Sequence, residues 1–248
     1  MIDTHDGWTR LTLNRPAVKN ALNTLLLAQL ADALDMLAAE KSCRAAMICG
    51  ADGNFAAGAD IGEIETKGSA EGAADPRKDY WARIRAFPKP LVAAIDGFAL
   101  GGGFELALMA DLIVLGETAR IGLPETNLGI MPGAGGSQRL LTLVGRARAT
   151  RLVMLGEIID AATAEAWGIA SWRIEGLAIP FAEDLCAKLA KRAPLSLAAS
   201  KKAIVMGDEQ KLAFAAERQG FEALLDSADK REGIAAFREK RKPEFKGE

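Results

Sequence analysis

The positions of hydrophobic and polar residues divide the first fifty residues into strand, helix and strand. Residues 8–14 (WTRLTLN) alternate apolar and polar side chains, which predicts a strand. From Asn20 to Ala39 apolar residues recur at helical spacing, and Asn20 fits the N-cap position of that helix. Residues 45–49 form a short apolar run that stops at Gly50, as expected of a buried strand.

The middle of the chain repeats this alternation with more glycine. Residues 91–96 (LVAAID) and 111–115 are short apolar runs that predict two further strands. Between them we expect a glycine-rich turn at residues 97–103 and a short helix at 104–110.

Two polar segments and a helical C-terminal part complete the pattern. Residues 66–79 are polar with Gly and Pro and predict a mobile loop, and residues 121–138, rich in Pro and Gly, predict a second loop. The rest of the chain is largely helical, with a short strand near 170–174 and an amphipathic region at 218–241 that breaks near Asp229. The recurring order of strand, loop and helix predicts an α/β fold.

Composition restricts the class of protein without indicating a reaction. The chain has 248 residues, half of them hydrophobic, which is enough for one large domain whose core needs no disulfide or metal. A net charge of −2 offers no general electrostatic attraction to nucleic acid. No segment has the features of a signal peptide or the length of a membrane span, so a cytoplasmic location is expected.

The cysteines and the single histidine argue against several chemistries. Cys43, Cys49 and Cys186 form no CxxC pair, so we expect buried thiols in a reducing compartment and neither a disulfide framework nor a zinc site. His5 is the only histidine, which disfavours a Ser–His–Asp or Cys–His arrangement. The sequence also contains no GxxxxGK[ST] phosphate-binding loop and no complete calcium-binding loop.

Three consecutive glycines, Gly101 to Gly103, stand between a predicted strand and a predicted helix in GFALGGGFE. Glycine lets other groups approach the backbone closely, and the unpaired amides at the start of a helix can stabilise an oxyanion. A second stretch of small residues, FAAGAD (55–60), would allow another amide to approach the same ligand. Three glycines alone are more often a sign of tight packing between a helix and a sheet, so both interpretations stay open.

Two glutamates are candidates for acid–base chemistry. Glu105 stands among apolar residues in FELALMA, where burial of an unpartnered carboxylate costs free energy and is expected to raise its pKa. Glu125 follows in the Pro- and Gly-rich loop, and loops carry functional residues more often than cores do. The alternatives are a favourable charge at the start of a helix for Glu105 and a solvated surface charge for Glu125.

In their order and spacing these motifs resemble the crotonase superfamily, and within it the enoyl-CoA hydratases. The resemblance runs from LNRP (13–16) to the tail FREKRKPEF (237–245), and it is strongest in FAAGADIGE, KPLVAAIDGFALGGGFELALMAD and LPETNLGIMPGAGGSQRL. It implies a crotonase-like α/β spiral core of ββα units at residues 1–190. A helical C-terminal region at 191–248 would then form homotrimers, often paired into hexamers.

The same resemblance implies an activity and its residues. The expected enzyme is a hydro-lyase that adds water reversibly to a trans-2-enoyl-CoA and yields a 3-hydroxyacyl-CoA, with no metal and no cofactor beyond the coenzyme A of the substrate. The amides of Ala59 and Gly102 would form the oxyanion hole, and Glu105 and Glu125 would hold the reacting water. Contacts to the acyl group or to coenzyme A are implied for Ala57, Asp60, Ile61, Gly133, Phe237 and Lys240.

Some positions depart from the common hydratase pattern. Gly62, Phe104 and residues 121–123 (Ile-Gly-Leu) stand where Lys, Cys and Phe-Gly-Gln are frequent, and these changes could reshape the acyl pocket. Phe237 and Lys240 match positions that reach the coenzyme A of a neighbouring subunit, with a solvated helix face as the alternative. The segments WARIRAF and PEFKGE resemble the dehydroadipyl-CoA hydratases of bacterial phenylacetate breakdown.

Three other functions stay open on the sequence alone. An enoyl-CoA isomerase and an acyl-CoA thioesterase share the fold. The resemblance implies that members in which one of the two carboxylates is missing usually isomerise or hydrolyse their substrate, so Glu at both positions favours the hydratase. A non-catalytic RNA-binding relative is the third alternative. The acidic balance of charges and the lack of a basic stripe argue against it.

Overall fold

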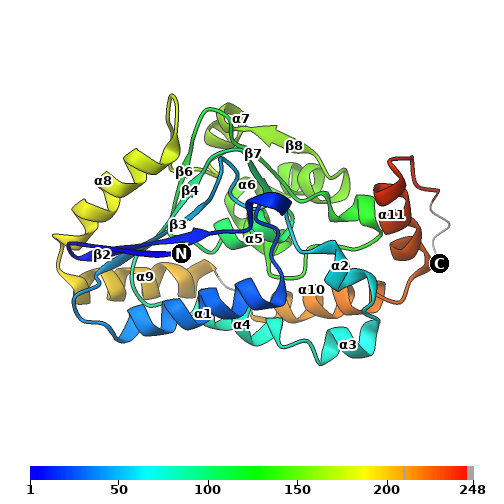
Figure 1. Cartoon of the computed structure of the whole chain (residues 1–248), viewed down its shortest axis with the longest axis horizontal. Coiled ribbons are helices and arrows are strands. Elements are labelled where there is room, and N and C mark those ends of the chain that lie inside the picture. Colours follow the sequence, from blue (N-terminus) through cyan, green and yellow to red (C-terminus); the bar gives the residue numbers. More distant parts are fainter. Residues whose placement is uncertain (209–210, 245–248) are drawn as a thin grey trace.

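Most of the apolar runs pair into one sheet (Figure 1). The structure is a computed structural model that describes residues 1–208 and 211–244, and among these the side chains of all but 206–208 and 211–217. β1 pairs antiparallel with β2, and the other neighbours in this sheet are parallel. The strands, in spatial order, are β1 (Ile2–His5), β2 (Trp8–Leu13), β3 (Ala45–Gly50), β4 (Leu91–Ile95), β6 (Leu112–Leu115) and β9 (Trp172–Arg173).

A smaller sheet stands beside the first and corrects three predictions. Its strands are β5 (Phe98–Leu100), β7 (Arg120–Gly122) and β8 (Ile158–Asp160), with β7 in the middle. β5 lies inside the predicted glycine-rich turn, β7 overlaps the start of the predicted loop, and β8 lies where the pattern predicted only helix. Strands of three residues contain too little alternation to be recognised from periodicity.

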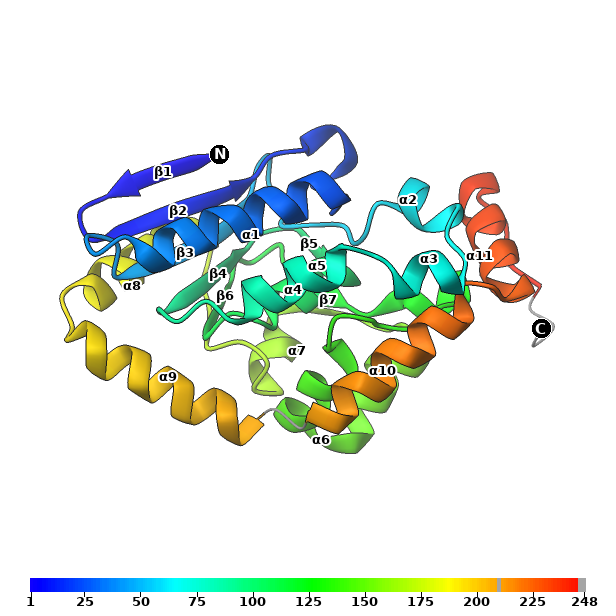
Figure 2. The same ribbon diagram turned by 90° about the horizontal axis from the view of Figure 1, so that it is seen from below.

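Helices cover both sheets, and those of the C-terminal part run along one side of the molecule (Figure 2). The break predicted near Asp229 lies at 225–227, and the assembly role predicted for residues 191–248 stays a prediction. The α-helices are α1 (Thr24–Ala39), α2 (Ile61–Glu65), α3 (Ser69–Ala73), α4 (Arg77–Arg85), α5 (Gly102–Ala107), α6 (Gly136–Met154), α7 (Ala161–Ala166), α8 (Ala178–Ala190), α9 (Pro194–Asp208), α10 (Lys211–Leu224) and α11 (Ala228–Glu239), and the 3-10 helices are η1 (Pro16–Val18) and η2 (Pro124–Leu128).

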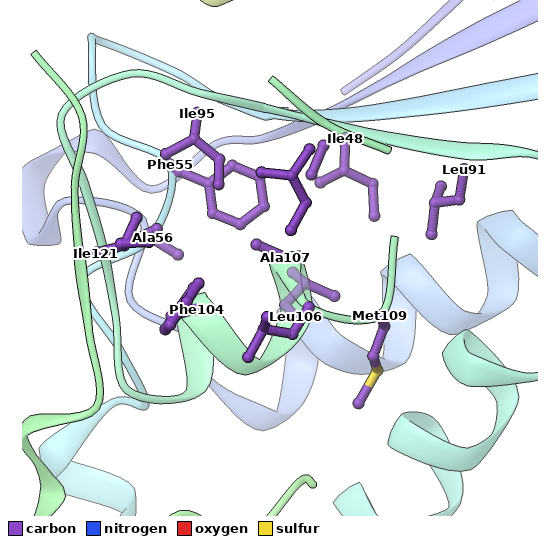
Figure 3. Close-up of a cluster of buried hydrophobic side chains, with 14 of the residues drawn as sticks. Ile48, Phe55, Ala56, Leu91, Ile95, Phe104, Leu106, Ala107, Met109 and Ile121 are labelled. Atoms are coloured by element: carbon purple, nitrogen blue, oxygen red, sulfur yellow. The ribbon is translucent and has the colours of Figure 1, made fainter. Parts of the chain in front are cut away.

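The main sheet is packed on both faces at its central strands, which explains why β3 and β4 are continuous apolar runs. Alternate residues of β3 point to opposite faces: Ile48 joins the larger core cluster, while Met47 joins a smaller one with Cys186 of α8. Figure 3 shows part of the larger cluster, in which Phe104 and Leu106 of α5 lie below the strands. The short helix α5 is therefore anchored in the core by its apolar side chains.

The predicted N-cap at Asn20 is wrong. The helix begins four residues later, where the side chain of Asn23 accepts a hydrogen bond from Leu26 N. Asn20 is instead buried in a left-handed conformation (φ 58°). Its amide nitrogen donates to Ala51 O and Asn54 O, and its Oδ1 accepts from the Arg15 N–H. Asn20 thus joins loops that are distant in sequence, which the local pattern does not show.

The prediction of a mobile loop at residues 66–79 is also wrong, since this segment contains α3 and the first turn of α4. The buried carboxylate of Asp75 organises it, accepting hydrogen bonds from Arg77 Nε (2.8 Å) and Lys67 Nζ (2.7 Å). Burial alone would raise the pKa of Asp75, but the hydrogen bonds from Arg77 and Lys67 outweigh it and lower the pKa to about 2. The polar residues that indicated a loop are the residues that order it.

Two further expectations can be compared with the structure. The three cysteines are buried free thiols, as predicted, and burial raises the pKa of Cys186 to about 12. Within residues 1–208 and 211–244, no helix has both the length and the apolar composition needed to cross a membrane.

We expect Asp75→Asn to lower the free energy of unfolding by about 3 kcal/mol near neutral pH, because it breaks a buried ion pair. The folded pKa of Asp75 is below its ordinary value, so its stabilisation is present above pH 3.8 and lost as the pH falls through about 2. The difference in free energy of unfolding between wild type and variant, measured by urea titration, should therefore become smaller below pH 4. Asp79→Asn, at an exposed position of α4, is the matched control; an Asp75→Asn deficit that does not change with pH would contradict this account.

Candidate active site

One cavity of about 660 Å³ lies between the glycine turn at 101–103 and the C-terminal helices. Residues from η1, α2, α4, η2, α10 and α11 contribute to its wall, so segments from the whole chain meet there. Most of the site residues predicted from the sequence line it, namely Ala57, Ala59, Ile61, Gly102, Glu105, Glu125, Gly133 and Phe237.

Two predicted site residues do not line this cavity. Asp60 caps α2 through a hydrogen bond from Gly62 N (3.2 Å) and forms an ion pair with Arg15 (3.0 Å). Lys240 ends α11 in a left-handed conformation (φ 54°) and is exposed to solvent. Their contacts to coenzyme A stay predictions.

The amide of Ala59 points into the cavity because of its pairing with Leu22. The two residues form an isolated parallel bridge, in which Leu22 N donates to Gly58 O (2.8 Å) and Asp60 N donates to Leu22 O (3.0 Å). In such a bridge the residue between the two bonded groups directs its own N–H to the opposite side. The Ala59 N–H therefore faces away from Leu22 and toward Gly102.

The three glycines have three different roles. Gly103 is needed for packing, since a Cβ there would overlap the carbonyl of Ala56. Gly101 has a positive φ (50°), and a Cβ there would lie 3.2 Å from Glu125 Oε1. At Gly102 a Cβ would meet only ordinary contacts, the nearest being Ala59 N at 3.7 Å. The packing interpretation is therefore correct for Gly103, whereas Gly102 borders open space beside a second amide.

Both amides are available to a ligand. Across the described residues, no hydrogen-bond acceptor is found for the N–H of Ala59 or of Gly102. Two such donors that face one space can hold a single oxygen atom that carries negative charge.

Glu105 is held in place from both sides. Its helix α5 is fixed in the core, and its carboxylate is only 4% exposed. Glu105 Oε1 accepts hydrogen bonds from Ala134 N (2.8 Å) in the loop before α6 and from Gly136 N (2.9 Å) at the first residue of that helix. Arg139 supports this loop, since its Nη1 donates to Ala134 O (3.0 Å). The carboxylate that seemed isolated in the sequence is thus bound by backbone amides from a distant segment.

Burial raises the pKa of Glu105 above its ordinary value. The amides of Gly136 and Ala134 and the positive charge of Arg139 act in the opposite direction but do not cancel the effect of burial. The rise expected from the apolar sequence around Glu105 is therefore present. A raised pKa is common among carboxyl groups that take part in acid–base chemistry.

Glu125 reaches the same cavity from η2 and is 8% exposed, so it is not a solvated surface charge. Helix α11 packs against η2 at two glycines that have no room for a side chain. A Cβ on Gly129 would lie within 2.5 Å of the Lys230 N atom, and a Cβ on Gly233 would lie 2.6 Å from the Leu128 carbonyl carbon. The last described helix therefore fixes the segment that carries Glu125.

The departures from the common hydratase pattern lie outside the cavity wall. Phe104 and the flanking residues of the 121–123 segment, Ile121 and Leu123, are completely buried in the core. Gly62 follows the cap of α2 and is also absent from the wall. These positions do not form the wall themselves, and their effect on the shape of the acyl pocket stays a prediction. The end of the tail motif, residues 245–248, lies outside the described residues.

Several wall residues were not found by sequence reasoning. They come from the segment before α1, from α4 and α10, and from the segment before α6, whose positions depend on long-range packing. WARIRAF was noted only as a resemblance, although its Trp81 stands 3.9 Å from the position of a Cβ on Gly102. The missed residues that matter most are Leu22, Arg77, Trp81, Met131, Arg218 and Phe221.

No metal centre is evident in the part of the chain that the structure describes, where no group of three or more His, Cys, Asp or Glu side chains could hold an ion. The described cavity brings together two buried carboxylates and two backbone amides.

Comparison with known proteins indicates one family. The family model described as enoyl-CoA hydratase/isomerase matches residues 3–248. The 2,3-dehydroadipyl-CoA hydratase of Escherichia coli (strain K12) is 48% identical over 240 residues, covering 96% of this chain and 94% of that protein. A probable enoyl-CoA hydratase of Bacillus subtilis (strain 168) is 40% identical over 247 residues, covering 96% and 95%. The crystal structure of an enoyl-CoA hydratase from Mycobacterium avium subsp. paratuberculosis K-10 matches with a TM-score of 0.88 at 32% identity, covering 99% of this chain and 98% of that one.

The burial of Glu105 predicts a dependence of stability on pH. Because its folded pKa is raised, the contribution of Glu105 to stability is fully present below its unfolded pKa and falls as the pH rises through the folded pKa. Glu105→Gln cannot ionise, so its free energy of unfolding should improve relative to wild type as the pH rises from about 4 to 8. Urea unfolding at both pH values measures this change. Glu117→Gln, at an exposed position, should leave the free energy of unfolding equal to that of wild type at both pH values. If the free energies of unfolding of Glu105→Gln and wild type differ by the same amount at both pH values, the account is refuted.

Proposed function

This chain belongs to the enoyl-CoA hydratase/isomerase family, and from that premise we propose that it hydrates a dicarboxylic trans-2-enoyl-CoA with Glu105 and Glu125 as its catalytic carboxylates. The observation that carries the proposal is that two backbone amides without acceptors and two buried carboxylates line one cavity. This set matches the needs of water addition to a conjugated thioester.

The family and its named members support the reaction and the fold. The chain is an enoyl-CoA hydratase, a hydro-lyase with the crotonase-like α/β fold that its sequence indicated. Water adds across the double bond of an enoyl-CoA, its oxygen to the β-carbon and a hydrogen to the α-carbon, and a 3-hydroxyacyl-CoA results. The isomerase, thioesterase and RNA-binding alternatives are not favoured, since the similar proteins are named as hydratases.

In the proposed mechanism the amides of Ala59 and Gly102 bind the thioester oxygen. Their N–H groups draw electron density from the conjugated system as the carbonyl gains negative charge, which makes the β-carbon electrophilic. A preorganised donor of this kind is worth about 3–4 kcal/mol of transition-state stabilisation. The fixed positions of both amides, which follow from the Leu22 bridge and the glycine turn, support this role.

The two carboxylates would share the water and the proton. Glu105 helps to activate the water that attacks the β-carbon, and Glu125 delivers a proton to the α-carbon. Burial raises the pKa of Glu105, which favours a role in proton transfer. Because the reaction is reversible, each carboxyl group takes the opposite role in dehydration. Water addition changes no net oxidation state, so we propose no cofactor other than the coenzyme A of the substrate.

The substrate class is proposed from the relative at 48% identity, which is named a 2,3-dehydroadipyl-CoA hydratase. Its name implies an enoyl-CoA of six carbons with a second carboxylate at the far end of the acyl chain. The local resemblance of WARIRAF supports the same class, because Trp81 of this segment lines the cavity. We therefore place the chain in phenylacetate catabolism.

We further propose that residues 191–248 assemble the chain into a homotrimer or a dimer of trimers. Phe237 lines the cavity but is 61% exposed, and Lys240 beside it is also exposed. Leu195 and Ile204 on α9 are 84% and 72% exposed, which is unusual for large apolar side chains and fits a contact with another copy. Coverage by a neighbouring subunit would complete the coenzyme A site.

Replacing either carboxylate tests the mechanism. We expect Glu105→Gln and Glu125→Gln each to reduce kcat for hydration by about 10²- to 10⁴-fold, since each removes one acid–base group. Hydration is followed with 2,3-dehydroadipyl-CoA and with trans-2-hexenoyl-CoA, and the wild type should prefer the former. Glu117→Gln is the control at an exposed site.

A variant that keeps near-full activity would remove that residue from the mechanism. Each protein should sediment with the mass of the wild-type trimer or hexamer, which shows that the fold and assembly are intact. A single-chain mass for the wild type would exclude the proposed assembly.

Gly102→Ala tests the oxyanion hole separately from the carboxylates. The added Cβ would lie 3.7 Å from Ala59 N with no severe overlap, so stability should change by less than about 1 kcal/mol. The methyl group would nevertheless stand between the two amides, where the thioester oxygen is proposed to bind. We expect kcat/KM to fall by about 10²-fold or more. A stable Gly102→Ala enzyme with wild-type kcat/KM would show that the oxygen binds elsewhere.

A further inference from the structure

Two arginines line the part of the cavity formed by α4 and α10. Arg77 is the first residue of α4, and Arg218 lies on α10, more than a hundred residues later in the chain. The side chains around them are mostly apolar, including Ile64, Trp81 and Phe221. Burying a guanidinium group among apolar side chains costs free energy unless its N–H groups find acceptors. The partners of both arginines therefore indicate which N–H groups remain for a ligand.

Arg77 is preorganised by the buried carboxylate of Asp75. Its Nε and Nη2 donate to Asp75 Oδ2 at 2.8 and 2.6 Å, and only 7% of the side chain is exposed. Its Nη1 is 3.8 Å from Glu63 Oε2, which is an ion-pair distance but too long for a hydrogen bond. The guanidinium is thus fixed along one edge, while Nη1 keeps donor capacity.

Arg218 is held in a similar way. Its Nε donates to Glu222 Oε1 (2.8 Å), its Nη2 donates to Gly72 O (3.0 Å), and the guanidinium stacks over the ring of Phe221 at 5.0 Å. Within the described part of the chain its Nη1 makes no hydrogen bond. Arg218 therefore also offers a fixed donor group whose outer nitrogen is available.

The two arginines belong to one cluster. Gly72 O, which accepts from Arg218, also accepts from the backbone N of Asp75 (3.3 Å), and Asp75 holds Arg77. Figure 2 shows α10 running past α3, and the two helices are in contact. The two guanidinium groups are thus linked through the end of α3.

Among the side chains that the structure describes, the charges of this cluster leave one cation in excess. Their ion pairs join four cations to three carboxylates, and a further anion would complete the balance. The cations are Lys67, Arg77, Lys78 and Arg218, and the carboxylates are Glu63, Asp75 and Glu222.

One helical turn separates Arg77 from Trp81, which lies beside the proposed oxyanion hole. Trp81 lies beside Gly102, and Arg77 is four residues earlier on the same helix. Side chains with this spacing share a face, with Cβ atoms about 5–6 Å apart. An extended chain of six carbons spans about 6 Å, which is comparable to this one-turn spacing.

We propose that Arg77 and Arg218 form the specificity site for the terminal carboxylate of a dicarboxylic enoyl-CoA. The inference rests on the proposed function and names the residues that select its substrate. Two guanidinium groups can bind the two carboxylate oxygens through charge-assisted hydrogen bonds from their Nη1 atoms, and a methyl group at the same position would leave those N–H groups without an acceptor.

The test measures selectivity as the ratio of kcat/KM for 2,3-dehydroadipyl-CoA to kcat/KM for trans-2-hexenoyl-CoA. We expect Arg218→Gln and Arg77→Gln each to reduce this ratio by about 10- to 100-fold, as for loss of a hydrogen bond to a charged group. Arg218→Lys should recover part of it, because the charge remains without the fork geometry. A purely structural defect would lower both rates together and leave the ratio unchanged.

Folding is protected in these variants because each carboxylate keeps a second cation. Glu222 retains Lys78 (3.0 Å) when Arg218 is replaced, and Asp75 retains Lys67 (2.7 Å) when Arg77 is replaced. Should Arg77→Gln fail to fold, Arg218→Gln decides alone. Arg83→Gln is the matched control on α4: it pairs with Asp32 and Asp35 away from the cavity, and the ratio should not change.

The possible outcomes distinguish a failure of the arginine site from a failure of the proposed hydratase function. A wild type that prefers the dicarboxylic substrate, with unchanged selectivity in the folded arginine variants, overturns the arginine site alone. Hydration of trans-2-hexenoyl-CoA without any preference for the dicarboxylic substrate overturns both the site and the substrate class but leaves the hydratase in place. A wild type that hydrates neither substrate overturns the proposed function, and the arginine site with it.

Discussion

The close approach of residues 55–59 to the glycine turn at 101–103 is the constraint on which the cavity depends. Ala56 touches the backbone of Gly103 so closely that any side chain there would collide with it. Two isolated parallel bridges, Ala56 with Ala99 and Leu22 with Ala59, align the segment over its whole length. Once this packing forms, the orientation of the Ala59 N–H is fixed, and it points into the open space beside Gly102. The packing of residues 55–59 against the glycine turn therefore also places the two amides that have no acceptor among the described residues. A change in this packing would also move the two amides.

The same packing buries the carboxylate of Glu105, which costs free energy. Its neighbours Phe104 and Leu106 anchor α5 in the core, and in doing so they carry the carboxylate into an apolar environment that raises its pKa. The amides of Ala134 and Gly136 offset part of this cost. A fold selected for stability alone would have an apolar residue here. Retention of a charged group is typical of sites where protein stability is balanced against chemistry.

The C-terminal helices complete the cavity that the first half of the chain begins. Helix α11 fixes η2 through contacts at Gly129 and Gly233, and so determines where Glu125 lies. Helix α10 contributes Phe221, whose ring would lie 2.8 Å from a Cβ on Gly133, and Arg218 beside it. The reacting groups and the groups proposed to select the acyl chain thus come from different parts of the sequence. This division lets the acyl end of the cavity change while the amides and carboxylates stay fixed.

The sequence by itself determined the features that depend on near neighbours. Continuous apolar runs identified the buried strands, the apolar context of Glu105 indicated its raised pKa, and the motifs around Gly102 and Glu125 indicated the family. Only the tertiary structure decided the rest. Residues 66–79 fold because Asp75 gathers Lys67 and Arg77, and Arg218 reaches the cavity because its guanidinium binds the carbonyl of Gly72. These are contacts between polar groups that lie outside any hydrophobic period, and the contact of Arg218 with Gly72 joins residues far apart in the chain. Their free energy is gained only when the backbone brings them together, so no local pattern of residues can reveal them.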